Sequence, residues 1–108
     1  MTALDTTLAI DVAIAPDHPA FAGHFPGSPV LPGVVLAALV LEAVRESPAH
    51  AARLGGMVQI DQLKFLAPVG PGASLCIKLW PQGRGVAFDI RQAATVVARG
   101  ALSAAAAT

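Results

Sequence analysis

Apolar and polar side chains alternate along the first part of the chain in a pattern typical of a β-strand. Between residues 8 and 14 every second position carries a large apolar side chain, and Pro16 ends the run. Further on, residues 34–41 are apolar at every position and contain no proline. This run predicts a helix over residues 33–46, because Pro32 stands where a helix can begin. A helix that is apolar on all sides is typically surrounded by protein, so we expect it to be buried on every face.

A second, shorter helix and four further strands follow in the pattern. Ser47 and Pro48 predict the cap and first residue of a helix that ends near Gly55. Alternating apolar positions predict the strands, the first with a phase shift that indicates a bulge: Val58 to Phe65, Leu75 to Leu79, Val86 to Ile90 and Val96 to Leu102. Turns are predicted at residues 68–72, 81–85 and 93–94. The order predicts the α+β class: a single domain, residues 1–108, in which a curved antiparallel sheet of about five strands wraps a central helix.

Composition narrows the classes of partner. Hydrophobic residues make up 55% of the chain and charged residues 13%, which favours an oligomer that buries an apolar face, or an apolar ligand tunnel. Seven basic and seven acidic residues balance, so no overall charge attracts nucleic acid or an anionic membrane. The longest run free of proline and charge, residues 33–41, is far short of the roughly 20 residues that span a bilayer. With no signal-like start, we expect a cytoplasmic protein without a membrane span.

The stretch GHFPGSPVLPGV, residues 23–34, carries the strongest chemical signal. Its prolines fix their own φ and push the preceding residues away from helix, so the loop is stiff. The one ionisable group that it holds is His24, and an imidazole transfers protons near neutral pH. The predicted helix start at Gly33 and Val34 supplies free N–H groups that suit a negatively charged oxygen.

This stretch resembles the active-site loop of the 3-hydroxyacyl-acyl-carrier-protein dehydratases, whose hot-dog fold carries a GHFPGxPVxPGV motif. A second segment, LKFLAPVGPG at residues 63–72, is similar to the strand and turn of that family. Ala73 stands after it, where an aspartate is usual. The resemblance implies a hot-dog fold, in which two units pair edge to edge into a dimer, and a substrate that is an acyl thioester linked to carrier protein or coenzyme A.

The resemblance also implies roles for individual residues. His24 would be the general base that removes the α-proton, and the amides of Gly33 and Val34 would stabilise the charge on the thioester oxygen. Phe25 and Ala38 would lie at the substrate.

Ala38 marks a departure from the family pattern. The family carries Glu or Asp at this helix position and contributes it to the site of the opposite subunit, and a methyl group donates no proton. Glu42 lies four residues later on the same helix face and is the candidate replacement. The alternative is that Glu42 is an ordinary glutamate at a helix end.

Three function classes remain open on these grounds. The first is a 3-hydroxyacyl-thioester dehydratase of fatty-acid or polyene synthesis. The second is a catalytically degenerate subunit that binds acyl thioesters or completes a heterodimer with a related chain, and the third is a hot-dog thioesterase. We expect no cofactor and no metal, because Cys76 is the only cysteine, and Asp17, His18 and His24 lack a second ligand pair.

Overall fold

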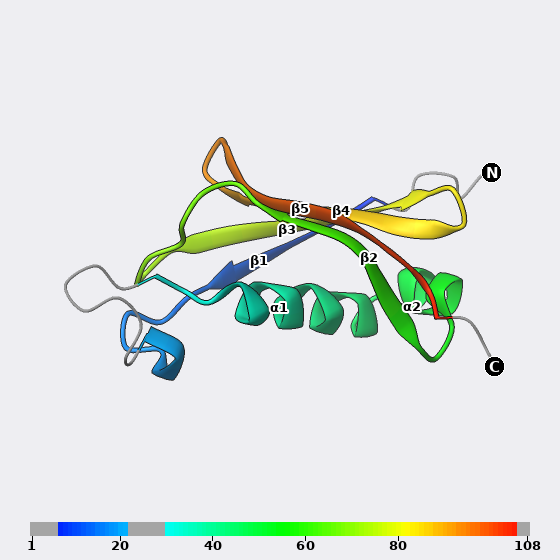
Figure 1. Cartoon of the computed structure of the whole chain (residues 1–108), viewed down its shortest axis with the longest axis horizontal. Helices are drawn as coiled ribbons and strands as arrows, with labels where there is room; N and C mark the ends of the chain where they lie inside the picture. The colour runs from blue at the N-terminus through cyan, green and yellow to red at the C-terminus, as the bar shows by residue number, and fades with distance from the viewer. Residues whose placement is uncertain (1–6, 22–29, 106–108) are drawn as a thin grey trace.

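The computed structural model describes residues 7–21 and 30–105. These residues form one antiparallel sheet of five strands with two helices (Figure 1), so the predicted α+β class is confirmed. Along the chain the elements are β1 (Leu8–Ala13), the 3-10 helix η1 (Pro19–Phe21), α1 (Gly33–Arg45), α2 (Pro48–Leu54), β2 (Val58–Phe65), β3 (Ser74–Gln82), β4 (Gly85–Gln92) and β5 (Thr95–Ala104). The strand order is β1-β3-β4-β5-β2, which leaves β1 and β2 as the edges of the sheet.

Helix α1 lies along one face of the curved sheet (Figure 1). Its buried side chains repeat at helical spacing: Leu36, Val40, Ala43 and Val44. The sheet meets them with alternate residues of its central strands, all almost fully buried: Ile77, Leu79, Phe88, Ile90 and Leu102. The core therefore lies between α1 and the concave face of β3, β4 and β5.

The opposite side of α1 is not covered by the described residues. Val34 is 75% exposed, and Ala38 and Glu42 are exposed on the same stripe, at intervals of four residues. The expectation that this helix is buried on every face is therefore wrong for the single chain. The sheet curves over one side only, and an apolar pattern does not say which surface covers the other.

The turns show a second difference between pattern and structure. The bulge in β2 is confirmed, since the register with β5 shifts between Ile60 and Gln62. However, β3 continues through Pro81, and the chain reverses at Gly83, whose φ is +57°. Proline is tolerated there because the pairing of β3 with β1 ends at Leu79, so the missing N–H costs no ladder bond on that side.

Candidate active site

The start of α1 presents backbone amides that have no acceptor among the described residues. The helix begins at Gly33 after Pro32, which provides no side-chain cap, and Val35 N–H donates to the Pro32 carbonyl at 3.0 Å. The N–H groups of Gly33 and Val34 therefore have no acceptor within the helix. They stand at the positive end of the helix dipole, where a developing negative charge is stabilised.

An apolar pocket of about 550 Å³ opens at this helix start. The end of the first motif and the second motif meet there, because Leu31 N–H donates to the Val69 carbonyl at 2.8 Å. The described lining carries only apolar side chains and glycine: Val30, Leu31, Pro32, Gly33, Leu36, Phe65, Leu66, Ala67, Pro68 and Val69. Such a lining suits a hydrocarbon chain rather than a charged group.

The absence of a side chain at Gly33 leaves room for its neighbour Phe65. A Cβ atom at this position would collide with three ring atoms of Phe65, which lies over the helix start. The ring is 52% exposed, and so it forms part of the outer wall of the pocket. The absence of a side chain thus lets an aromatic ring approach the amides of the first turn.

The residues proposed from sequence are only partly brought together. Gly33 lines the pocket, and the adjoining Val34 points to the exposed side of α1. Ala38 and Glu42 lie on that exposed stripe and line no wall of this pocket in the single chain. His24 and Phe25 lie outside the described residues.

Sequence reasoning missed the walls that the second motif supplies. Phe65 and Leu66, at the end of β2 and just beyond it, are half exposed beside the helix start. Their signal was available, since two large apolar residues stand next to each other shortly before Pro68 and break the period of two. The second motif supported the family resemblance, but only the folded structure shows that its residues lie beside Gly33.

Within residues 7–21 and 30–105, no group of three or more histidine, cysteine, aspartate or glutamate side chains is placed to hold a metal ion. His18 occupies a turn, where its Nδ1 accepts a hydrogen bond from Ala20 N–H at 3.0 Å. In the same part of the chain, neither helix is long and apolar enough to cross a bilayer.

Comparison with known proteins identifies the family. Residues 1–101 match the family described as ApeI-like, ApeI dehydratase. The chain belongs to the ApeI-like dehydratase family.

This ApeI-like chain is also similar to curated proteins named 3-hydroxyacyl-[acyl-carrier-protein] dehydratase FabZ. The protein from Paramagnetospirillum magneticum is 35% identical over 89 residues, which cover 74% of this chain and 54% of that protein. The one from Pelotomaculum thermopropionicum is 35% identical over 88 residues, or 77% and 63%. The chain spans about half the length of the curated relatives that it matches.

Solved structures confirm the hot-dog fold of the ApeI-like chain. The dehydratase heterocomplex ApeI:P from Xenorhabdus doucetiae superposes with a TM-score of 0.75 at 23% identity, covering 95% of this chain and 97% of that chain. An acyl-CoA hydrolase from Staphylococcus aureus gives 0.65 at 16% identity, with coverage of 93% and 67%. At these identities the likeness concerns the fold alone, and it agrees with the sheet order and the central helix seen here.

Proposed function

We propose that this chain acts on 3-hydroxyacyl thioesters linked to a carrier protein or to coenzyme A, as a dehydratase subunit that works in a dimer. The observation that carries the proposal is the apolar pocket at the uncapped start of α1, where both motifs meet. A hydrocarbon chain fits such a lining, and a thioester oxygen at the helix start would find the amides of Gly33 and Val34.

In this proposal His24 takes the proton from the α-carbon. The electron pair moves towards the thioester oxygen, and the first-turn amides stabilise the charge that grows there. The bond between the β-carbon and the hydroxyl oxygen then breaks, a carbon–carbon double bond forms, and the hydroxyl leaves as water once an acid has donated a proton to it.

The acid is the open part of the mechanism. Ala38 supplies none, and its exposed position on α1 means that a second subunit facing this stripe would meet a methyl group there. We therefore propose that a homodimer of this chain dehydrates poorly, unless Glu42, one turn further along the same stripe, takes the role.

A degenerate subunit in a heterodimer is the second candidate function. The solved structure described as the dehydratase heterocomplex ApeI:P supports it, since a protein of this fold there works beside a different chain. In such a pair a related partner would bring the missing carboxylate to the site that contains His24. The third reading, a thioesterase, needs a carboxylate that activates water, and no described residue of the pocket lining supplies one.

The test is turnover of a 3-hydroxyacyl-carrier-protein substrate, followed by the absorbance of the unsaturated thioester. We expect weak activity from the wild type and a gain of at least about tenfold in Ala38→Glu, because a positioned general acid contributes roughly 10²–10⁴-fold. The position is exposed, so glutamate fits without overpacking the single chain. The double variant His24→Ala/Ala38→Glu should not show this increase in dehydration, because it lacks the proposed general base.

Glu42→Gln is the matched control. It should lower activity only if Glu42 supplies the proton. Robust wild-type dehydration that is indifferent to both His24→Ala and Glu42→Gln would contradict the proposal. Activity that arises only when a related subunit is added, with no gain in Ala38→Glu alone, would favour the heterodimer.

A further inference from the structure

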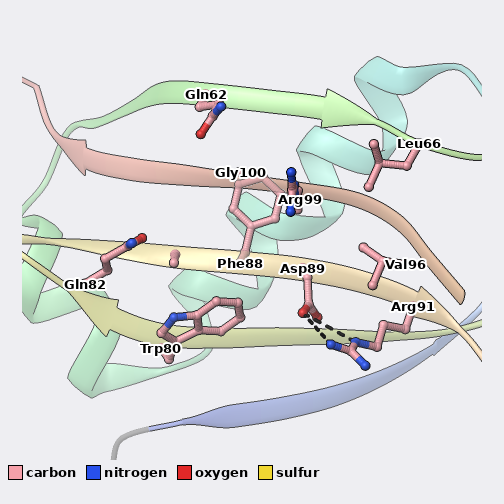
Figure 2. A pocket seen from close by; sticks show the side chains of 11 residues that line it. Gln62, Leu66, Trp80, Gln82, Phe88, Asp89, Arg91, Val96, Arg99 and Gly100 are labelled. Carbon is pink, nitrogen blue, oxygen red and sulfur yellow. Dashed lines mark hydrogen bonds and ion pairs between the residues drawn. The ribbon is translucent and has the colours of Figure 1, made fainter. Parts of the chain in front are cut away.

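A second pocket lies on the outer face of the sheet, the face opposite α1 (Figure 2). Its volume is about 380 Å³, within the range of roughly 300–1,000 Å³ that small-ligand pockets show. Unlike the pocket at the helix start, it has charged and amide side chains in its lining, beside the Trp80 indole and the apolar Leu66, Phe88 and Val96. Its main polar walls are Gln62, Gln82, Asp89, Arg91 and Arg99.

The strand register sets these groups in a row across the sheet. Lys78 on β3 pairs with Asp89 on β4, Asp89 pairs with Arg99 on β5, and Arg99 pairs with Lys64 on β2. Residues directly opposite in an antiparallel pair point to the same face, about 5 Å apart. Three cationic side chains therefore stand in line with one carboxylate. The same face also carries Arg91, Asp11 and Asp61, so positive charge exceeds negative charge by one on the face as a whole and is concentrated in this row.

Asp89 is the buried centre of the row. The residue is 8% exposed, and its Oδ2 accepts hydrogen bonds from Arg91 Nη2 at 3.2 Å and Nε at 3.4 Å. Its other oxygen, Oδ1, is buried and meets no donor among the described residues. A buried acceptor without a partner costs about 1–3 kcal/mol, so this oxygen offers a place for an incoming O–H or N–H group.

Trp80 forms the wall on the other side of Asp89. It pairs with Ala87 on β4, whose small side chain leaves the indole room to lie over the outer face (Figure 2). The ring is half-buried and belongs to the pocket lining. An aromatic face of this kind accepts a flat ring by stacking.

We propose that the outer pocket binds a nucleotide. The order of groups across the strands matches the order of parts in the ligand. The base stacks on Trp80 of β3, a ribose hydroxyl donates to Asp89 Oδ1 on β4, and the phosphate binds Arg99 on β5 with Lys64 beside it. Trp80 and Arg99 are two strands apart and offset by two residues along the strands, about 12 Å between their backbones, which a mononucleotide spans from base to phosphate together with the long arginine side chain.

The charges favour this occupant over a second copy of the chain. Two outer faces in contact would each bring the same excess of cations, so Lys64, Lys78 and Arg99 would meet like charges. A carboxylate is the acceptor that proteins commonly offer to a ribose hydroxyl, and guanidinium groups bind phosphate through paired N–H donors. The shared chemistry is that of a free nucleotide or of the nucleotide end of coenzyme A.

Trp80 also makes the test direct. It is the only tryptophan, and the chain has no tyrosine, so indole fluorescence reports on this pocket alone. We expect AMP to change the emission of the full-length protein saturably, with calorimetry giving the same affinity. Adenosine, inorganic phosphate and 2′-deoxy-AMP should each bind about tenfold more weakly or worse, since each lacks at least one of the three proposed contacts.

Arg99→Gln should weaken AMP binding by about tenfold to a hundredfold, the loss of one charge-assisted contact. Its matched control is Arg84→Gln, an exposed arginine in the β3–β4 turn, which should bind AMP like the wild type. Coenzyme A that binds as tightly as AMP identifies the cofactor's nucleotide end as the ligand, and weaker binding identifies a free nucleotide. The proposal is overturned if AMP gives no saturable response, if Arg99→Gln binds normally, or if phosphate alone binds as well as AMP.

Discussion

At the scale of single residues, two small side chains determine what the candidate active site can do. Gly33 has no Cβ, which leaves room for the Phe65 ring above the first-turn amides. Ala38 lies exposed one turn from Val34, so its methyl group faces whatever covers that stripe of α1. The two positions differ in how much room the structure leaves for a larger side chain. A side chain at 33 would displace the Phe65 ring, whereas the exposed Ala38 has room for a larger side chain on the described surface of α1.

Ala93 has a positive φ, which is unfavourable for a residue with a Cβ atom. It opens the two-residue turn between β4 and β5 with φ +55°, a region that an L-residue with a Cβ enters at a cost of about 1–2 kcal/mol. Glycine is favoured at such turn positions. We predict that Ala93→Gly raises the free energy of unfolding by about 0.5–1 kcal/mol, after its greater entropy in the unfolded chain is counted. Urea denaturation measures this.

The neighbouring Ala94 provides the comparison for that change. Its φ is not positive, so Ala94→Gly brings only the entropy cost and should lower the free energy of unfolding by about 0.4–1 kcal/mol. Equal effects of the two substitutions would show that the positive φ at Ala93 carries no strain.

At the scale of elements, the short helix α2 ties the sheet to the end of α1. Pro48 begins it as predicted, but Ser47 does not cap it with its side chain. Instead the Ser47 hydroxyl lies 2.7 Å from Nδ1 of His50, a buried pair at the junction with α1. At the other end of α2, Leu54 is fully buried, so the helix is anchored by packing as well as by polar contacts.

Arg53 links this helix to the hairpin between β3 and β4. Its Nε donates to the Gly85 carbonyl at 2.7 Å, and its Nη2 donates to the Gly83 carbonyl. We predict that Arg53→Ala lowers the free energy of unfolding by about 1–2 kcal/mol, because charge-assisted bonds to carbonyls are lost at a partly buried site. Arg84→Ala, in the same turn but exposed, should change it by less than about 0.5 kcal/mol. Similar losses in both variants would argue against the link.

At the scale of the whole molecule, the β2 edge of the sheet has no partner strand among the described residues. On this strand the large apolar side chains of Ile60 and Phe65 are exposed among polar ones, and Val34 is exposed on α1, next in the chain to the Gly33 that the Phe65 ring approaches. An edge strand with open N–H and C=O groups pairs readily with another strand. We infer that this edge and the exposed stripe of α1 are covered by a second subunit.

Val34→Glu should therefore weaken association by about tenfold or more, since a charge would be buried in an apolar contact. The single chain should remain folded, because this side chain is 75% exposed and glutamate suits the first turn of a helix. Sedimentation over a range of concentrations measures the effect. Ala49→Glu, also at an exposed position in the first turn of a helix, α2, is the control and should leave association unchanged. A wild type that stays monomeric, or a Val34→Glu variant that associates normally, would refute the inference.

The sequence alone determined the elements and their class. Periods of two and of 3.6 residues are local properties, so the helix from Gly33, the short helix after Ser47 and the bulge near Ile60 were all predictable. The proline- and glycine-rich motif and its resemblance were equally local, and comparison with relatives confirmed the family that they indicated. The role of His24 stays a prediction.

Only the tertiary structure decided which faces meet and which are left open. In the tertiary structure Phe65 packs against Gly33, and β3 continues beyond Pro81. The stripe of α1 that begins at Val34 is exposed, although the apolar run had predicted a helix buried on every side. The tertiary structure also aligned Asp89 with cations from other strands on the outer face. The physical reason is that register and sheet curvature join residues far apart in sequence, and neither can be read from the order of side chains along one strand.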